Sequence, residues 1–351
     1  MSCGLSSGRG EGWAAVVNIA LIGYGYWGPN LARNLQVLRG AKLVACCELD
    51  ASRLALAHNL YPHAVTTPHV AEIWHDAGIE AVVIATPPQT HFSLAKAALG
   101  AGKHVLVEKP LAMNSRDAEE LIALAEARGR VLMVGHTFEY NPAVLKIKEL
   151  VTQGQLGQVY YAYSTRVNLG RMQRDLNALW SIVPHDISIL LFLFEQMPLE
   201  VSARGNGYLN TGVEDVVFVS LQFPNGITAY IHASWLDPSK VRRMTIVGSQ
   251  KMVVYDDVDS EGKVKIYDKG VLKVTHGDIF GEFQYKLHSG DIHIPRIDLS
   301  EPLRNECAHF VECVEKGTKP QTDGQNGLRV IKVLEAAQRS LGKRGAPVEV
   351  T

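Results

Sequence analysis

The chain has 351 residues, of which 46% are hydrophobic and 20% charged, and its formal net charge at pH 7 is −1. This length suits two domains, and the apolar content is ample for two cores. The near-neutral charge gives no electrostatic reason to expect nucleic acid or an anionic membrane surface as partner. No apolar run reaches the roughly 20 residues that a membrane helix needs. Residues 1–15 lack the apolar centre of a signal peptide and are expected to form a flexible leader.

The cysteine pattern points to a reducing compartment. Five cysteines occur, none in a CxxC pair, and two of them are adjacent within an apolar run. An odd number in this arrangement indicates buried thiols and neither a disulfide framework nor a metal site. The sequence therefore predicts a cytoplasmic protein without a bound metal. The cysteines are Cys3, Cys46, Cys47, Cys307 and Cys313.

From residue 16 onwards, short β-branched runs alternate with helical patterns. The runs are apolar on both faces, which is typical of a parallel sheet covered by helices on both sides. The predicted strands are 16–23, 41–50, 80–87, 104–110 and 130–136, and the predicted helices are 29–38, 51–60, 91–102 and 117–129. The first part, residues 16–138, is therefore expected to be an α/β domain of the Rossmann type.

The pattern changes after Asn141 and Pro142. One helical segment (143–154) is followed by alternating, strand-like runs up to residue 274, and residues 301–341 return to helix. Pro224 to Gly226, between two alternating runs, predicts a hairpin. We expect residues 139–351 to form an α+β domain with a large, open and mostly antiparallel sheet, whose last helices can pack back on the first domain. By fold analogy alone, its open face suits a homodimer or homotetramer.

A glycine motif lies where the first predicted strand meets the first predicted helix. The segment GYGYWG runs from Gly23 to Gly28, and only in this context does GxGxxG indicate dinucleotide binding. Gly23 permits a tight turn, Gly25 lets the backbone approach the pyrophosphate, and Gly28 allows close packing of helix on strand. The phosphates would meet free N–H groups at the helix N-terminus, with Tyr26 and Trp27 beside them.

Acidic residues follow at the end of the second predicted strand. Glu48 and Asp50 lie about 20 residues beyond the glycine motif, where an acid binds the adenine ribose hydroxyls. An acid at this position repels the additional phosphate of NADP, so NAD is the favoured cofactor. Arg53 follows closely and is a further candidate contact. Its positive charge argues against the preference for NAD over NADP. A glycine turn in an unrelated α/β protein is the weaker alternative, since strand, helix and acid are all present.

Two more candidate segments lie at carboxyl ends of predicted strands, where ligands bind in open α/β sheets. Thr86 and Pro87, followed by His91, end the third predicted strand, and Glu108 with Lys109 ends the fourth. A proline-stiffened turn before a helix explains the first segment equally well, and a solvated loop lysine explains the second. A lysine beside a cofactor can instead orient a substrate hydroxyl and lower its pKa.

Three of these motifs together resemble a known family. GYGYWG, TPPQTH and VEKPL, in this order and spacing, are similar to motifs of the Gfo/Idh/MocA oxidoreductases, which include glucose–fructose oxidoreductase and inositol dehydrogenase. The resemblance covers nearly the whole chain from Val17. It implies a Rossmann domain followed by a domain with a broad open sheet, and a role for Lys109 in substrate binding and catalysis beside the nicotinamide.

The family also has an Asp four residues before a His in its second domain. Here the segment WSIVPHDISILL places His185 at the histidine position and Ser181 at the aspartate position. The resemblance implies that His185 is catalytic, and the chemistry agrees, because oxidation of a carbinol needs a base for the hydroxyl proton. A histidine that caps the following helix is the plain alternative. Asp186 is expected to point elsewhere on that helix.

Ser181 is a departure from the family pattern. A serine cannot supply the negative charge that would hold His185 in one tautomer and stabilise its protonated form. Three alternatives stay open: Lys109 and His185 suffice, activity is reduced, or the substrate is handled differently.

Three further segments resemble one branch of the family. GYGYWGPNLARN, RVNLGRMQRDLNALW and ASWLDPSKVRRMTIVGSQKM are similar to members that oxidise C3 of UDP-N-acetylglucosamine or its uronic acid. Arginine grips a diphosphate bidentately, and Asn168 and Asn177 are candidates to recognise sugar hydroxyls or the acetamido group. Arg166 is the first candidate cation and Arg174 another, although a solvated strand edge explains each arginine singly. The full cation set is Arg166, Arg171, Arg174, Lys240, Arg242 and Arg243.

The sequence thus predicts an NAD-dependent enzyme with a nucleotide-sugar substrate. Two other functions stay open. One is an inositol or simple aldose dehydrogenase of the same family, which does not need the cation set. The other is an inactive, cofactor-binding sensor or scaffold, which the missing aspartate permits.

Overall fold

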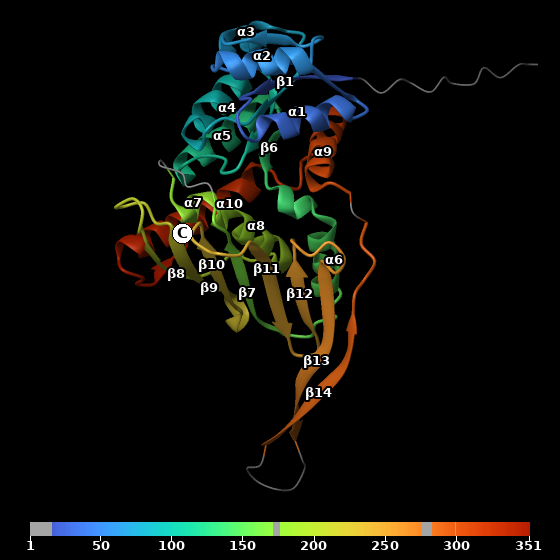
Figure 1. Ribbon diagram of the computed structural model, residues 1–351, viewed down its shortest axis with the longest axis vertical. Coiled ribbons are helices and arrows are strands. Elements are labelled where there is room, and N and C mark those ends of the chain that lie inside the picture. The colour runs from blue at the N-terminus through green and yellow to red at the C-terminus, as the bar shows by residue number, and fades with distance from the viewer. Residues whose placement is uncertain (1–15, 171–175, 276–282, 299) are drawn as a thin grey trace, which may run out of the picture.

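The computed structural model describes residues 16–170, 176–275, 283–298 and 300–351. Figure 1 shows two sheets, each with its own helices, stacked along the long axis of the molecule. The smaller sheet belongs to the N-terminal part of the chain and the larger sheet to the part that follows. The predicted combination of a parallel sheet domain with a second, mostly antiparallel sheet domain is confirmed.

The first sheet has six parallel strands in the order β3-β2-β1-β4-β5-β6. This order reverses between β1 and β4, and such a reversal opens a crevice at the carboxyl ends of the strands where dinucleotides bind. The strand β3 was not predicted, because its three residues are too few for a pattern. The strands are β1 (Val17–Ile22), β2 (Ala41–Cys47), β3 (Val65–Thr67), β4 (Ala81–Ile84), β5 (His104–Glu108) and β6 (Leu132–Gly135).

Local signals set the ends of the helices in this domain. Pro29 lies in the first turn of α1, where its missing N–H removes no hydrogen bond of the helix. The Asp50 carboxylate caps α2 by accepting from the backbone N–H groups of Ser52 and Arg53. The helices are α1 (Gly28–Val37), α2 (Ala51–Leu60), α3 (Val70–His75), α4 (His91–Gly100) and α5 (Ser115–Arg128), with the 3₁₀ turns η1 (Pro88–Thr90) and η2 (Thr137–Tyr140).

The second sheet has nine strands in the order β14-β13-β12-β11-β7-β10-β9-β8-β15. All neighbours are antiparallel except β7 and β10. The predicted hairpin at Pro224 to Gly226 is present as the turn η3 between β9 and β10. The strands are β7 (Val159–Val167), β8 (Glu200–Asn206), β9 (Val216–Gln222), β10 (Thr228–Ser234), β11 (Val241–Gly248), β12 (Met252–Asp256), β13 (Val264–Thr275), β14 (Phe283–His293) and β15 (Val348–Glu349).

Helices cover one face of this sheet and leave the other face open. α6, α8 and α10 contact its strands from one side, and α10 also packs on α5 and β6 of the first domain. α9 packs on α1 and β1 instead. One buried apolar cluster runs from the first sheet through α10 and α8 to the second sheet, so both domains share a core that fixes the crevice between them. These helices are α6 (Pro142–Thr152), α7 (Ala178–Ser181), α8 (Val183–Phe194), α9 (Pro302–Lys316) and α10 (Gly324–Gly342).

Within the described residues, no helix is long and apolar enough to cross a membrane, and no cluster of three or more His, Cys, Asp or Glu side chains offers a metal site. Cys46, Cys47, Cys307 and Cys313 are free and buried. Cys3 lies outside the described residues.

Candidate active site

In the glycine turn between β1 and α1, protein atoms lie close to two of the three glycines, and the space beside the third glycine is open. Gly23 has φ +94°, and a Cβ there would lie 2.7 Å from the Ala85 carbonyl oxygen. A Cβ on Gly28 would lie 2.3 Å from the Gly23 oxygen. A Cβ on Gly25 would meet only Nη1 of Arg53, at 3.5 Å. The space over Gly25 and the N-terminus of α1 therefore fits the pyrophosphate of a dinucleotide.

The acidic residues at the end of β2 hold this turn in place. One carboxylate oxygen of Glu48 accepts from the Tyr24 backbone N–H at 2.6 Å, and the other accepts from the Asp50 N–H at 2.9 Å. Tyr26 is 82% exposed and Trp27 36% exposed at the mouth of the turn. Direct contacts of these side chains with the cofactor stay predictions.

His91 connects the loops after β4 and β5. It is fully buried, with Nδ1 2.7 Å from the Pro110 carbonyl oxygen and Nε2 2.9 Å from that of Thr86. Burial lowers the pKa of His91, so the ring is neutral at pH 7 and donates to one carbonyl at a time. His91 therefore fixes the turn that carries Thr86 and Pro87, with its own ring nitrogens directed at backbone.

Lys109 reaches from the carboxyl end of β5 into the second domain. Its Nζ donates to the Ser181 carbonyl oxygen at 2.9 Å, so the structure brings together the two segments singled out by sequence. Burial lowers the pKa of Lys109, the Glu108 carboxylate opposes that shift, and the Arg166 cation adds to it. Burial raises the pKa of Glu108 to about 7. The lysine is thus held at a fixed point with N–H groups left for a ligand.

His185 lies in the first turn of α8, opposite Lys109. It is not the N-cap, which is Ile182, so the capping alternative does not apply. The ring packs edge-on against Phe138 at 5.0 Å between centroids, and Nδ1 has no hydrogen-bond partner in the described chain. Burial, reinforced by the positive charges of Lys109 and Arg166, lowers its pKa well below 6.5. His185 is therefore a neutral imidazole that can accept a proton.

Arg166 packs on the same Phe138 ring as His185 and forms an ion pair with Asp186. Its Nε and Nη2 donate to Asp186 at 2.7 and 3.2 Å, and Ser164 Oγ donates to the same carboxylate at 2.6 Å. The guanidinium stacks 4.4 Å from the Phe138 ring centroid and Arg166 is only 7% exposed. Asp186 thus occupies Nε and Nη2 of Arg166, and a contact of Arg166 with a substrate phosphate stays a prediction. Asp186 itself points away from His185, as expected.

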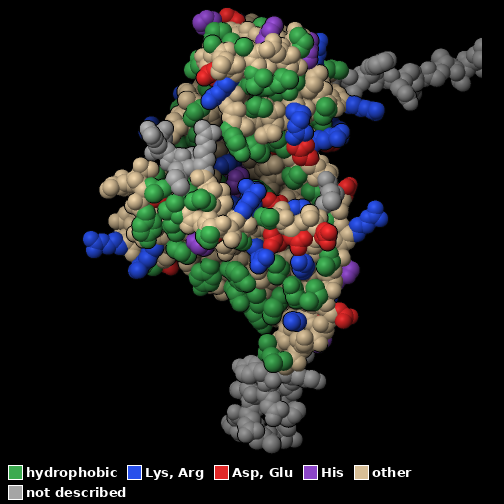
Figure 2. All heavy atoms as spheres, in the orientation of Figure 1, with side chains coloured by type: hydrophobic (Ala, Val, Ile, Leu, Met, Phe, Trp, Pro, Cys, Tyr) green, Lys and Arg blue, Asp and Glu red, His purple; other side chains and the backbone are tan. Residues whose placement is uncertain are grey.

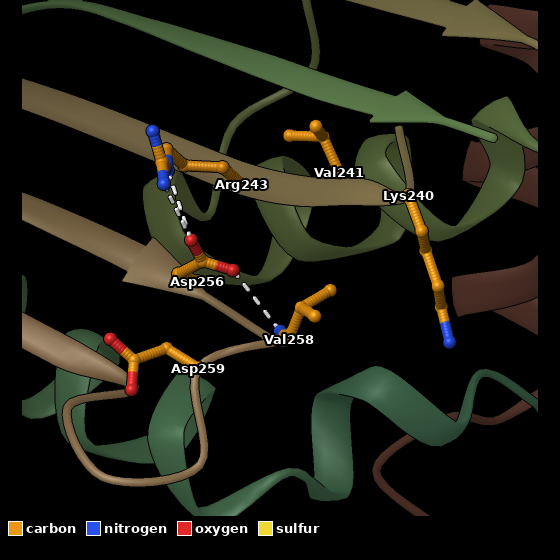
Figure 3. A pocket seen from close by; sticks show the side chains of 6 residues that line it. All are labelled: Lys240, Val241, Arg243, Asp256, Val258 and Asp259. Carbon is orange, nitrogen blue, oxygen red and sulfur yellow. Dashed lines mark hydrogen bonds and ion pairs between the residues drawn. The ribbon is translucent and has the colours of Figure 1, made fainter. Parts of the chain in front are cut away.

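Because side chains alternate along a strand, the neighbouring cations of β11 lie on opposite faces of the second sheet. Arg242 pairs in register with Arg166 and shares its face, whereas Arg243 is on the opposite face of β11. The side chain of Arg242 is 42% exposed, lies 3.5 Å from the Asp257 carboxylate, and its charge contributes to the low pKa of His185. Arg243 pairs with Asp256 at 2.7 Å in a shallow pocket of the open face that Lys240 also lines (Figure 3).

The two candidate asparagines have different surroundings in the structure. Asn177 caps α7 by accepting from the Trp180 N–H, and its amide donates to Glu214 at 2.7 Å and Gln338 at 3.0 Å, so it organises the loop. Asn168 is half-buried just beyond β7, and its role in substrate binding stays a prediction. Arg171 and Arg174 lie outside the described residues.

Sequence reasoning missed the segment after β6. Glu108 of β5 pairs in register with Gly135 of β6, so the next residues, Lys109 and His136, lie at the same sheet edge. Phe138 from η2 forms the wall between His185 and Arg166. The sequence did contain a signal for this segment. Residues 130–136 were a predicted strand, and the carboxyl end of that strand lies at the same sheet edge as Lys109. Figure 2 shows a hollow between the two domains, with blue and purple side chains in and below it.

Crevice, glycine turn and facing lysine and histidine define a dinucleotide-dependent oxidoreductase. Residues 17–136 match the model of the oxidoreductase family with NAD-binding Rossmann fold, and residues 144–254 match that of the GFO/IDH/MocA C-terminal domain. The chain therefore belongs to the Gfo/Idh/MocA family, and the predicted resemblance is confirmed. It is an NAD-dependent oxidoreductase that acts on CH–OH groups.

Relatives in the family act on different substrates. D-apiose dehydrogenase of Paraburkholderia graminis is 24% identical over 94% of this chain and 89% of its own length. UDP-N-acetylglucosamine 3-dehydrogenase of Acidithiobacillus ferrooxidans is 29% identical over 55% of this chain and 60% of its own length. A solved structure described as an oxidoreductase from Magnetospirillum magnetotacticum MS-1 is 30% identical, with a TM-score of 0.78 over 92% of this chain and 100% of that chain.

Proposed function

We propose that this protein oxidises the C3 hydroxyl of a UDP-N-acetyl-hexosamine to a 3-keto sugar. The observation that supports this substrate is Arg242, a half-exposed cation that shares the sheet face of Arg166 and whose charge acts on His185. Its carboxylate neighbour Asp257 also accepts from Tyr255 at 3.0 Å and lies 3.7 Å from Lys263 Nζ. Because Asp257 is shared among three donors, Arg242 keeps charge and N–H donors for a diphosphate.

Lys109 and His185 divide the chemistry at C3. The Ser181 carbonyl fixes one N–H of Lys109, and the remaining N–H groups donate to the C3 oxygen and stabilise the charge that develops on it. The neutral ring of His185 accepts the hydroxyl proton. Bound NAD would supply the acceptor for the C3 hydrogen, which leaves as hydride. The C–H and O–H bonds break, a C=O bond forms, and the proton leaves on histidine.

A free sugar is the second candidate substrate. The relative that acts on D-apiose matches 94% of this chain, a greater share than the relative that acts on the nucleotide sugar. A free aldose or inositol would use Lys109 and His185 in the same way. It has no diphosphate and would therefore gain nothing from Arg242. An inactive sensor would bind NAD and turn over neither.

The test combines a substrate panel with two matched variants. The protein is incubated with NAD and UDP-N-acetylglucosamine, its uronic acid, D-apiose, myo-inositol or glucose, while NADH and keto products are measured. We expect turnover of a nucleotide sugar, and Arg242→Gln should raise its KM about tenfold or more with little change in kcat. Arg243→Gln is the control, because the same side chain faces the opposite side of the sheet.

Three outcomes distinguish the candidates. Turnover confined to free sugars contradicts the nucleotide-sugar proposal. Equal effects of Arg242→Gln and Arg243→Gln on KM would show that Arg242 does not bind the diphosphate. No turnover of any sugar favours the sensor, once tightly held NADH has been replaced by NAD and a keto-sugar acceptor has been supplied.

We also propose that copies of the chain associate through the open face of the second sheet. Tyr163, Phe218 and Tyr230 are 44%, 55% and 51% exposed there, and the Phe218 ring stacks on His232 at 4.3 Å between centroids. A contiguous apolar face of this kind favours a protein partner. Light scattering should give a dimer or tetramer mass, and a monomer would contradict the proposal.

A further inference from the structure

His136 is a buried imidazole without a described partner at the edge of the cofactor crevice. It directly follows β6, beside Lys109 at the end of β5, and is 1% exposed. Among the described residues, neither Nδ1 nor Nε2 of His136 has a hydrogen-bond partner. Burial and the charge of Lys109 lower its pKa to about 3. At neutral pH the ring therefore offers one N–H donor and one acceptor nitrogen.

The segment around this ring is held firmly. Thr137 Oγ1 donates to the buried carboxyl of Glu306 in α9 at 2.9 Å. The amide of Asn326 in α10 donates to Glu139 at 3.1 Å. Side chains of η2 are thus tied to both C-terminal helices. Among the described residues of this region, Glu306 Oε1 and Asn326 Oδ1 each lack a partner, and His136 is the residue in which both side-chain nitrogens do. A buried polar group without a partner loses its hydrogen bonds to water and gains none, so such a site calls for an explanation, of which a ligand is one.

The position in the sheet indicates which ligand atom that is. A dinucleotide spans the crevice with one nucleotide on each half of the sheet. Glu48 and the β1–β3 half take the adenosine, so the ends of β4, β5 and β6 face the nicotinamide. The nicotinamide ring carries one polar substituent, a carboxamide with a donor NH₂ and an acceptor oxygen. These functions complement the two nitrogens of a neutral imidazole.

We propose that His136 hydrogen bonds to the nicotinamide carboxamide of NAD. Together with the Phe138 wall, this contact fixes the rotation of the nicotinamide ring about its glycosidic bond. It thereby decides which face of the ring meets the sugar held by Lys109 and His185. His136 acts through the cofactor and needs no contact with the substrate.

The test compares NAD with ADP-ribose, which lacks only the nicotinamide, by calorimetry without any sugar present. His136→Leu should weaken NAD binding about tenfold and leave ADP-ribose binding within twofold. His136→Gln, whose amide also donates and accepts, should restore most of the NAD affinity. Equal losses for both ligands would assign His136 a purely structural role, and no loss for NAD would exclude the contact. Both results overturn the proposal.

A measurement on the unaltered protein covers the case in which His136→Leu does not fold. Histidine ring nitrogens are labelled with ¹⁵N, and the signal of His136 is assigned with the Gln variant. NAD should shift this signal, and ADP-ribose should leave it near its position in the free protein. An identical response to both ligands overturns the proposal.

Discussion

At the scale of single residues, the proposed catalytic roles of Lys109 and His185 depend on what each side chain already contacts. Among the described residues, Lys109 Nζ donates only to the Ser181 carbonyl, so it keeps N–H groups for a ligand. Nδ1 of His185 has no described partner, whereas Arg166 is matched by Asp186. The first two residues keep polar atoms for a ligand, whereas two nitrogens of Arg166 already donate to Asp186, a distinction that no motif in the sequence makes.

Lys109→Ala should abolish turnover and leave NAD affinity nearly unchanged. The variant removes the donor to the C3 oxygen, and a positioned acid–base group contributes about 10²–10⁴ in rate. Steady-state kinetics and NADH titration measure the two effects separately. Loss of cofactor binding together with turnover would instead make the lysine structural.

Ser181→Asp should raise the pKa of His185 toward its ordinary value of 6.5. Residue 181 lies one helical turn before His185, so a carboxylate there can accept from the unpartnered Nδ1 and stabilise the imidazolium. A stronger base should also raise kcat/KM at pH 7. NMR titration of the His185 ring measures the shift, with Ser181→Asn as the uncharged control. An unchanged pKa would show that the site is built around serine.

The glycine turn gives a prediction with an internal control. Gly25→Ala should weaken NAD binding roughly tenfold and change the free energy of unfolding by less than about 0.5 kcal/mol, because its Cβ meets only the end of Arg53. Gly28→Ala should cost about 1–3 kcal/mol of stability as well, since its Cβ overlaps the Gly23 oxygen. Denaturant unfolding and NAD titration separate the two. Equal destabilisation would contradict this reading of the turn.

At the scale of elements, the anchoring of η2 predicts a pH dependence of stability. Burial raises the pKa of Glu139 from 4.5 to about 8. A group whose pKa is raised by folding stabilises the native state fully below pH 4.5, and that contribution is lost as the pH rises through 8. Glu108 and Glu306 are shifted in the same direction, so these three carboxyls should stabilise the fold less at pH 8.5 than at pH 6. The buried histidines act in the opposite sense, because their lowered pKa values add stability as the pH rises through 6.5.

Glu139→Gln should reduce this loss, because the amide keeps a neutral group at the same place. Thermal melts at pH 6 and pH 8.5 check the expectation, and Glu119→Gln on the exposed surface of α5 is the control. The change in Tm from pH 6 to pH 8.5 should be more favourable in Glu139→Gln than in the unaltered protein, and Glu119→Gln should match the unaltered protein. The same change in Tm in Glu139→Gln and the unaltered protein would show that Glu139 does not carry the effect.

The elements that the sequence predicted are those with enough residues to show a period. The glycine turn, the alternation of strands and helices and the hairpin at Pro224 to Gly226 were all predicted. β3 and α3 were missed because they are short, and β14 because its polar residues and Gly290 interrupt any alternation. The division of Arg242 from Arg243 follows from strand periodicity and could have been predicted. The pairing of Arg166 with Asp186 could not, because it joins two segments through tertiary packing.

At the scale of the whole molecule, the two domains act as one body around the crevice. α10 contacts β6 and α5 on one side and β8 and α8 on the other, and a common apolar core runs through it. Lys109 from the first domain therefore donates to the Ser181 carbonyl of the second domain, and its charge acts on the nearby His185. We infer that this shared core positions the proposed cofactor residues and the proposed substrate residues relative to one another, as hydride transfer requires.

The most direct test of this account follows the hydrogen itself. UDP-N-acetylglucosamine carrying deuterium at C3 is incubated with NAD and the protein, and the NADH is analysed by mass spectrometry. We predict that the deuterium is found on the nicotinamide and that the reaction is slower than with the unlabelled sugar if hydride transfer limits its rate. NADH without deuterium, or no NADH while D-apiose or myo-inositol is oxidised, would contradict oxidation of the nucleotide sugar at C3.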